Sequence, residues 1–476
     1  MWQRIKMTTN TVSNPPRHHE PALKANELCT QFTNRCKTMN LPIETQTMLE
    51  QLEHNRLISI ENAKHVVSCA DTPIVMHELL EALSNRKDTA PGIDKVTYSM
   101  IHHAPSNIKQ RLIHIYNKIL STGRMPQCWK VAEIIAIPKP GQTEAYRPIS
   151  LLPVISKIFE RIILKRLQYV CRPLHTNTMG FKKKQGTTDA IATFINDMTK
   201  NKRNCKHDHA VAVYIDLEKA FELANKNVVL SEIVRAGVKG NILKVLSDYL
   251  TDRRAVVAFQ GCTSNRTTFE NGTPQGSTLS PTLFNMLIDR LVTTDMPKGI
   301  KVIAYADDLI MYTVNIKRGN SVTLAQRGLN KLYEVATTLG LTFSESKTKA
   351  MYFNSGNDPN VHLVINDQPI EWTRCYKYLG VMINKRLDIR DHIEYTIEKA
   401  NRKINALKVL ATCSGVNANV LRLIFCSTIQ PTLVYGIHFS NISNECHIKD
   451  LNKIQNSALR IISRFSQWTH VHSMRY

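Results

Sequence analysis

The feature that most constrains the fold is a pair of adjacent aspartates, Asp307 and Asp308, inside the apolar stretch IAYADDLIMYTV (303–314). Neighbouring side chains of a strand point to opposite faces, so one unbroken strand would drive a carboxylate into the core. Burying an unpaired carboxylate is costly. A hairpin avoids that cost because both acids then fall in the tight connection, where aspartate is favoured. The pattern predicts strand–turn–strand, although such a pair alone is more often a turn with two solvated acids.

A third acid, Asp216, ends the run HAVAVYIDLEKAF, which is typical of a central strand buried on both faces. Placed beside the hairpin turn, it would complete a cluster of three carboxylates. Such a cluster repels itself unless divalent cations bind it, and hard oxygen ligands favour Mg²⁺. The formal net charge of +23, from 62 Lys and Arg against 39 Asp and Glu, indicates a polyanionic partner. Together these features favour metal-assisted nucleotidyl transfer on nucleic acid.

Other features narrow the class of protein. The 11 cysteines are scattered singly without a C-x-x-C pair, which is typical of reduced thiols in an intracellular protein. No uninterrupted apolar run approaches the roughly 20 residues of a membrane-spanning helix, so no membrane partner is expected. The N-terminal residues lack a signal-peptide pattern and, being polar and rich in Pro and His, predict disorder.

Strand and helix patterns are intermixed along the chain, with hairpins in place of strict alternation, which favours an α+β fold. Strands are predicted in VAEIIAIPKPG, RRAVVAFQG, KAMYFN and YKYLGVMI. Helices are predicted in PIVMHELLEALSN, SNIKQRLIHIYNKILSTG, ISLLPVISKIFERIILKRLQYV and HIEYTIEKANRKINALKVLA, and helix dominates from residue 388 onward.

Several motifs resemble, in order, those of reverse transcriptases from non-LTR (LINE-type, jockey-like) retrotransposons. VYIDLEKAF, NGTPQGSTLSP and AYADDL are similar to motifs A, B and C, and TAPGIDKVTY, IPKPG and AYRPISLLPVISKIFERII to the fingers motifs. GLTFSESKTKAMYF resembles motif D and YKYLGVMI the primer grip. The resemblance implies a right-hand polymerase architecture with an antiparallel palm sheet. Its expected parts are a partly disordered N-terminal extension (1–70), fingers (71–209), palm (210–385), and a helical thumb with the following segment (386–476).

The resemblance also implies roles for individual residues. Asp216 and Asp307, helped by Asp308, match the ligands of two Mg²⁺ ions, for which Mn²⁺ could substitute, and Lys347 matches a lysine that protonates the leaving pyrophosphate. The incoming dNTP would meet Lys139, Arg147, Gln275 and Phe221, the last as a ring that excludes a ribose 2′-hydroxyl. Template and primer would meet Gly276, Tyr378, Leu379 and Gly380. In the expected thumb helix, Ile393, Ile397, Ile404 and Leu407 lie on one apolar stripe, and Lys399, Arg402 and Lys403 on its basic remainder would also meet template and primer, although a merely solvated face fits nearly as well.

The function these residues predict is RNA-directed DNA polymerisation, in which dNTPs extend a DNA primer 3′-hydroxyl on an RNA template. The expected location is the nucleus, a cytoplasmic ribonucleoprotein, or both, and the oligomeric state is left open. The alternatives are a decayed or co-opted copy that only binds RNA, a viral RNA-dependent RNA polymerase, and a group II intron maturase. Intact acids and glycines disfavour the first, and ADD in place of GDD disfavours the second. Few residues precede the fingers, so the chain is interpreted as the polymerase part of a larger product or a truncated copy.

Overall fold

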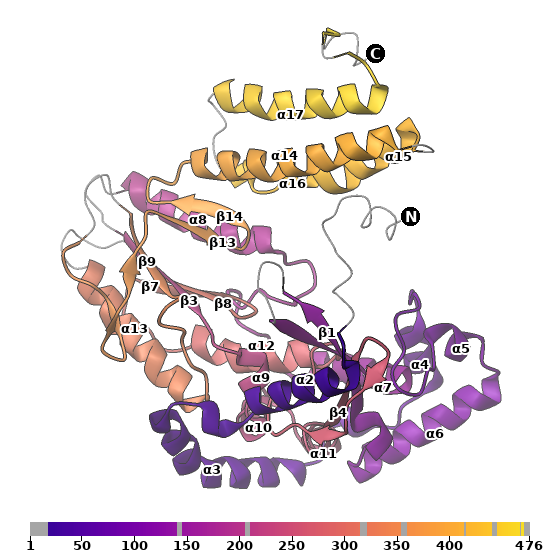
Figure 1. Ribbon diagram of the computed structural model, residues 1–476. Coiled ribbons are helices and arrows are strands. Elements are labelled where there is room, and N and C mark those ends of the chain that lie inside the picture. Colours follow the sequence, from indigo (N-terminus) through magenta and orange to yellow (C-terminus); the bar gives the residue numbers. More distant parts are fainter. Residues whose placement is uncertain are drawn as a thin grey trace.

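The structure is a computed structural model that describes residues 18–139, 145–204, 210–314, 321–353, 359–413, 416–439, 445–466 and 468–470. These residues form a body of two sheets wrapped by helices, with a separate layer of C-terminal helices above it (Figure 1). The predicted α+β class is confirmed.

The central sheet has five strands in the order β12-β9-β3-β8-β7, and β3 pairs antiparallel with both neighbours. Strand β3 is buried on both faces, as its unbroken apolar sequence predicts, and Asp216 at its end is half-exposed. Helix α8 packs on one face, and α12 and α13 pack on the other. The strands are β3 (Ala210–Asp216), β7 (Ile300–Tyr305), β8 (Asp308–Thr313), β9 (Lys349–Phe353) and β12 (Glu371–Trp372).

The predicted hairpin is formed by β7 and β8. Tyr305 pairs with Asp308, and Ala306 and Asp307 form the two-residue turn between them. Ala306 has a φ of 58°, the left-handed conformation that tight hairpin turns require. The prediction is therefore confirmed, with Asp308 placed as the first residue of β8.

A second sheet joins two segments that are far apart in the sequence. β1 pairs antiparallel with β2 and parallel with β4, and apolar side chains of β1 and β4 share one core cluster. β1 and β2 lie in the segment predicted as fingers and β4 in the segment predicted as palm, so one sheet contains strands from both segments. The strands are β1 (Val131–Pro138), β2 (Tyr146–Leu151), β4 (Arg254–Phe259), β5 (Cys262–Thr263) and β6 (Thr267–Thr268).

Two N-terminal helices pack on this body. Helix α2 (Pro21–Arg35) lies across the second sheet and buries Leu28 and Phe32 against it, while α3 (Ile43–Lys64) contacts α10 and α13 (Figure 1). The apolar residues of α3 do not gather on one face, so helical periodicity did not reveal it. Residues 1–17, where disorder is predicted, lie outside the described residues.

The remaining helices of the body enclose the sheets. Helix α6 ends at Gly123, whose φ of 69° provides a left-handed cap. The helices are α4 (Met76–Leu83), α5 (Tyr98–His103), α6 (Ser106–Thr122), α7 (Val154–Val170), α8 (Thr187–Asn204), α9 (Ala220–Leu223), α10 (Lys226–Arg235), α11 (Gly240–Tyr249), α12 (Ser280–Val292) and α13 (Ser321–Thr338).

The C-terminal part contains small hairpins and then helices. YKYLGVMI was predicted as one strand but forms a hairpin, because Leu379 and Gly380 adopt positive φ angles of 46° and 89° and reverse the chain. In the predicted apolar stripe of α14, Ile393, Ile404 and Leu407 are buried and Ile397 is half-buried. The elements are β10 (Val364–Ile365), β11 (Gln368–Pro369), β13 (Cys375–Tyr378), β14 (Val381–Asn384), α14 (Arg390–Thr412), α15 (Ala418–Ile424), α16 (Gln430–Val434) and α17 (Glu445–Ser463).

One helical stretch among the described residues, Ala418–Phe439, is long and apolar enough to cross a membrane by length and composition, with a mean hydropathy of 1.4. Polar residues interrupt its apolar positions, so no uninterrupted apolar run marks it in the sequence. Leu421, Phe425 and Ile429 recur every four residues and are buried in one cluster with α14 and α17. The stretch thus packs one face against neighbouring helices, and 28% of its apolar 18-residue window is buried.

Candidate active site

Three carboxylates gather at one end of the central sheet. Asp216 ends β3 and Asp308 begins β8, and the two are direct cross-strand partners, which places their side chains on the same face. Asp307 lies next to them in the turn. Burial of the carboxyl group, followed by repulsion from Asp307 and Asp216, raises the pKa of Asp308 to about 6. Asp308 as a whole residue remains exposed, so the site is crowded with negative charge yet open to solvent.

The carboxylates do not form a finished cation site. Within the described residues, no group of three or more His, Cys, Asp or Glu side chains is arranged to hold a metal ion. The Lys347 Nζ lies 3.2 Å from Asp216 Oδ2 and supplies a positive charge there. This ammonium and the raised pKa of Asp308 both indicate a surplus of negative charge that a divalent cation would relieve. The residues present therefore fit a cation, with Asp216 and Asp307 as candidate ligands.

Acidification is expected to weaken cation binding at this site. A carboxyl group with a pKa of about 6 is largely protonated below that pH, so the proton competes with the cation, and affinity is full only above it. Calorimetric titration of Mg²⁺ between about pH 5 and pH 8 should show affinity falling as the pH drops through 6. Asp308→Asn should remove this dependence. An affinity of the parent chain that is constant across the range would contradict the expectation.

Phe221 lies in α9, directly after β3. Its ring stacks on Phe284 of α12 with 3.9 Å between ring centroids, and the ring of Phe181 approaches it edge-on at 6.1 Å. The half-buried Phe221 ring is therefore supported by two other aromatic rings near the strand end that carries Asp216.

Phe181 is a residue that sequence reasoning missed. Its side chain is 52% exposed and its φ is 57°, a rare conformation for a bulky residue. The preceding segment runs along β7, where the Met179 N–H donates to the Ala304 carbonyl at 2.8 Å. A Cβ on Gly180 would lie 2.3 Å from the Ala306 nitrogen, so glycine is needed against the turn that carries Asp307. In the sequence, the only sign of this residue is a Gly-Phe pair before three lysines, and such a pair does not predict which residues it contacts.

The turn that precedes α12 carries Gln275 and Gly276. The Ser150 N–H of β2 donates to the Gln275 carbonyl at 2.7 Å, and the Thr273 N–H donates to the Phe221 carbonyl at 3.0 Å. Gly276 has a φ of 128°, and a Cβ there would lie 2.3 Å from the Ser150 oxygen. The close approach that this glycine permits is thus to β2, and the predicted approach to nucleic acid stays a prediction.

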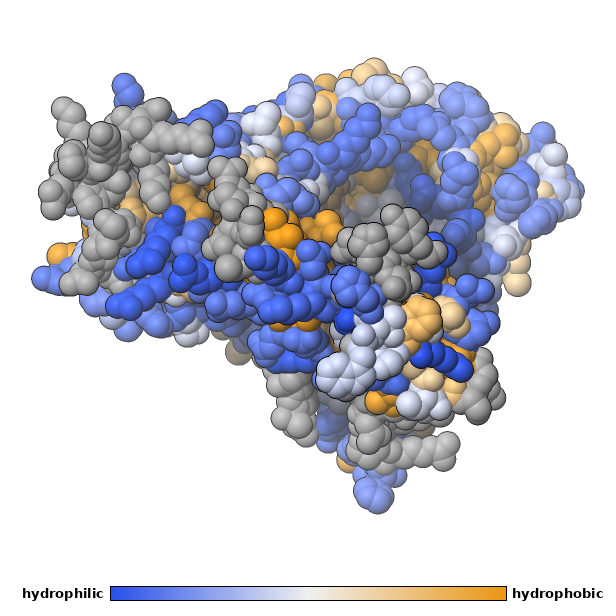
Figure 2. Space-filling view, turned by 90° about the horizontal axis from the view of Figure 1, so that it is seen from above, coloured by the Kyte–Doolittle hydropathy of each residue, from blue (hydrophilic) through white to orange (hydrophobic). Residues whose placement is uncertain are grey.

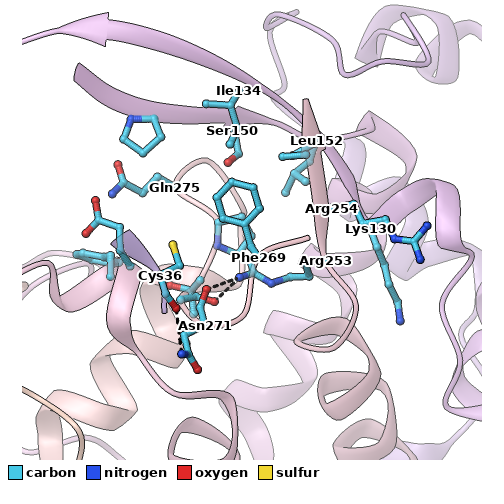
Figure 3. Close-up of a pocket in the computed structure, with 18 of the residues that line it drawn as sticks. Cys36, Lys130, Ile134, Ser150, Leu152, Arg253, Arg254, Phe269, Asn271 and Gln275 are labelled. Atoms are coloured by element: carbon cyan, nitrogen blue, oxygen red, sulfur yellow. Dashed lines mark hydrogen bonds between the residues drawn. The ribbon is translucent and has the colours of Figure 1, made fainter. Parts of the chain in front are cut away.

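A cavity of about 60 Å³ lies beside this turn (Figure 3). Arg253 extends across it and donates hydrogen bonds to the Asn271 and Gly272 carbonyls. Arg253 Nε and Thr273 Oγ1 are buried without a protein partner among the described residues, and the volume is sufficient for ordered water to reach them. Arg253 therefore supports the first half of the turn.

The two basic residues predicted at the triphosphate lie on the hairpin of β1 and β2. Arg147 is exposed and pairs across the strands with Ile137. Lys139 follows β1, and its N–H donates to the Ala145 carbonyl at 2.7 Å. The hairpin thus brings both residues to the same end of the second sheet.

Of the predicted nucleic-acid contacts in α14, Lys399 and Arg402 are exposed, and Arg402 pairs with Glu398. Lys403 is different, because its ammonium donates to the Thr428 carbonyl at 2.7 Å and to a second threonine. Lys403 therefore ties α14 to α16 and to the helical turn just before it. Figure 2 views the molecule from above, the side on which the C-terminal helices lie, and this face is mostly hydrophilic and is hollowed.

The hairpin of β13 and β14 holds the other predicted contacts. Tyr378 is 3% exposed and packs against Phe194 and Tyr214, so its side chain belongs to the core. Leu379 and Gly380 form the turn, and the Tyr435 hydroxyl donates to the Leu379 carbonyl at 2.6 Å. This bond connects the hairpin turn to the helical layer.

Comparisons with known proteins agree with this arrangement. A family model described as reverse transcriptase (RNA-dependent DNA polymerase) matches residues 137–383, just over half of the chain. The RNA-directed DNA polymerase from mobile element jockey of Drosophila funebris is 27% identical over 405 residues, which cover 82% of this chain and 44% of that relative. The Drosophila melanogaster counterpart is 28% identical over 393 residues, covering 79% and 42%. The chain thus spans less than half the length of these relatives.

Among solved structures, a telomerase from Candida tropicalis in complex with a fragment of telomeric RNA matches with a TM-score of 0.40 and 14% identity. The match covers 81% of this chain and 69% of the telomerase chain. A score below 0.5 is too low to support a structural argument, so the family match rests on sequence.

Proposed function

Because this chain belongs to the reverse transcriptase (RNA-dependent DNA polymerase) family, we propose that it extends the 3′-hydroxyl of a DNA primer with dNTPs on an RNA template. The observation that carries the proposal is the meeting of Asp216, Asp307 and Asp308 at one strand end inside the matched region. The excess of basic residues supports binding to a polyanion.

Similarity to the jockey polymerases supports an origin in a non-LTR, LINE-type retrotransposon. On that proposal, the primer is nicked genomic DNA and the template is the RNA of the element. The corresponding location is the nucleus, a cytoplasmic ribonucleoprotein, or both.

The proposed function assigns roles to individual residues. Asp216 and Asp307 would hold Mg²⁺ or Mn²⁺, with Asp308 as a weaker ligand, and such ions supply positive charge that activates a hydroxyl and stabilises a departing pyrophosphate. Lys347 would deliver a proton to that pyrophosphate, and its Nζ lies 3.2 Å from Asp216 Oδ2. Lys139 and Arg147 would bind the triphosphate, Arg147 as a bidentate fork.

Primer extension by the purified chain tests this function. A DNA primer annealed to an RNA template should be extended with dNTPs in the presence of Mg²⁺, and chelation of the metal should stop the reaction. A matched reaction on a primer without template controls for terminal addition. Absence of extension under all of these conditions would reject the proposal.

Discrimination between sugars is expected to depend on Phe221. Phe221→Ala removes the ring that would collide with a 2′-hydroxyl, so the preference for dNTPs over rNTPs should fall by at least about tenfold, or roughly 1.4 kcal/mol. The ratio of kcat/KM for matched dNTP and rNTP measures it. Phe465→Ala, a truncation of another part-exposed phenylalanine in the helical layer, is the control. An unchanged ratio in the Phe221 variant would remove the gate role.

A further inference from the structure

Glu160 is a fully buried acid in the middle of α7, at 0% exposure. Its Oε2 accepts hydrogen bonds from Ser277 Oγ at 2.7 Å, from the Thr278 N–H at 2.8 Å and from the Leu279 N–H at 3.3 Å. Burial raises the pKa of Glu160, and these three hydrogen bonds oppose the rise. One carboxyl oxygen thus accepts all three hydrogen bonds from the end of the turn that carries Gln275 and Gly276.

The same donors immediately precede the N-terminus of α12. Leu279 is the residue before the helix, and Ser277 Oγ also accepts from the Leu279 and Ser280 N–H groups at 3.0 and 3.2 Å. The Tyr249 hydroxyl completes a buried chain by donating to Ser277 Oγ at 2.6 Å. An acid from another helix therefore caps α12 at the end where its dipole favours negative charge.

The turn is held at three points. At its entry, the Phe221 and Ala224 carbonyls accept from the turn backbone, and at its tip Ser150 donates to the Gln275 carbonyl. These are backbone hydrogen bonds, which a side-chain substitution leaves in place, and the Arg253 side chain adds its bonds to the Asn271 and Gly272 carbonyls at the entry. The exit is held by Glu160, so that anchor depends on the chemistry of one side chain.

We propose that Glu160 is a positioning residue for the nucleotide site: its buried carboxyl group fixes the exit of the 272–277 turn and thereby the place of Gln275 beside Phe221. This inference rests on the proposed function, because it assigns Gln275 to the incoming nucleotide. Glu160 does not touch the substrate, so its effect should appear in the apparent affinity for dNTPs before it appears in the chemical step.

The test compares two replacements of Glu160. Glu160→Leu places an apolar side chain of similar size there and removes the acceptor, so Ser277 Oγ and the Thr278 N–H lose their bonds to Glu160 and the Leu279 N–H retains only Ser277 Oγ. Glu160→Gln keeps one amide oxygen able to accept from them. Glu160→Leu should raise the KM for dNTPs at least about tenfold with a smaller loss in kcat, because small misplacements near a reacting centre are costly. Glu160→Gln should restore the KM to within about threefold of the parent.

A second readout does not require activity. Hydrogen exchange of the peptide spanning 272–280 should become faster in Glu160→Leu and stay near the parent rate in Glu160→Gln. Glu78→Leu is the matched control. Glu78, on α4, pairs with Arg166 of α7, the helix that carries Glu160, but does not contact the turn. This variant should lower the melting temperature without changing the KM or the exchange of 272–280.

The outcomes separate the claims. If Glu160→Leu lowers the melting temperature as Glu78→Leu does, but leaves the KM and the exchange of 272–280 unchanged, Glu160 is only structural and the inference is wrong. If the parent chain extends no primer, the proposed function fails, and the exchange data alone judge whether Glu160 fixes the turn. If Glu160→Leu does not fold, Ser277→Ala removes one partner of Glu160 and is judged by the same two measurements.

Discussion

Primer extension is expected to fall by at least about 10³-fold when Asp307 is replaced with alanine, the scale on which loss of an electrostatic stabiliser at a reacting centre reduces kcat. The fold should survive, because Asp307 lies exposed in a two-residue turn and supports no core packing. Removing one of three crowded carboxylates also relieves repulsion, which should lower the pKa of Asp308. Single-turnover extension at saturating Mg²⁺ measures the effect.

Glu371→Ala is the matched control for this variant. Glu371 is an exposed acid on β12, at the outer edge of the same sheet, where it pairs with Lys349. Its removal should leave extension within about twofold of the parent, since surface ion pairs contribute little. Full activity of Asp307→Ala would show that this carboxylate is not part of the catalytic site.

Gly180→Ala is expected to reduce kcat by about 100-fold while the chain still folds, because displacements of about 1 Å near a reacting centre have effects of this size. The added Cβ would lie 2.3 Å from the Ala306 nitrogen and 3.0 Å from its Cα, and backbone atoms cannot rotate away as a side chain can. The turn that carries Asp307 must therefore shift. Comparison of single-turnover rates and melting temperatures separates misplacement from unfolding.

Gly186→Ala serves as the control in the same connection. The nearest atom to a Cβ there is 3.5 Å away, an ordinary contact. This variant should extend primers at close to the parent rate. Equal rates for Gly180→Ala and the parent would mean that the turn accommodates the methyl group, and the tight packing against Ala306 would then be of no consequence for catalysis.

The sequence predicted the parts of the site in which local pattern and chemistry coincide. The unbroken apolar run before Asp216 required a central strand, and the paired acids at 307 and 308 required a turn, so the meeting of these carboxylates could be expected. Their direct cross-strand pairing could not, because register depends on how β3 and β8 align in three dimensions.

Other features depend on contacts between segments that no local pattern connects. Lys403 lies on the basic face of α14, yet it bonds inward to Thr428, and helical spacing alone cannot distinguish the two directions. Tyr378 was predicted as part of a strand, but its burial depends on contact with Phe194 of helix α8. The roles of Gly180 and Glu160 could not be predicted from the sequence, because the residues that they contact in the fold are distant along the chain.

The parallel pairing of β1 with β4 also has a consequence for folding during synthesis, because β1 is made well before its partner strand. Val131 faces Arg254, so the partner strand is made more than 100 residues later, a delay of roughly 5 to 25 s at ordinary rates of synthesis. Throughout that interval one edge of β1 has no partner strand, and the apolar side chains of β1 lack their contacts with Ala255 and Val257. Until β4 has been made, the nascent polypeptide therefore exposes an unpaired strand edge at which it is prone to aggregate.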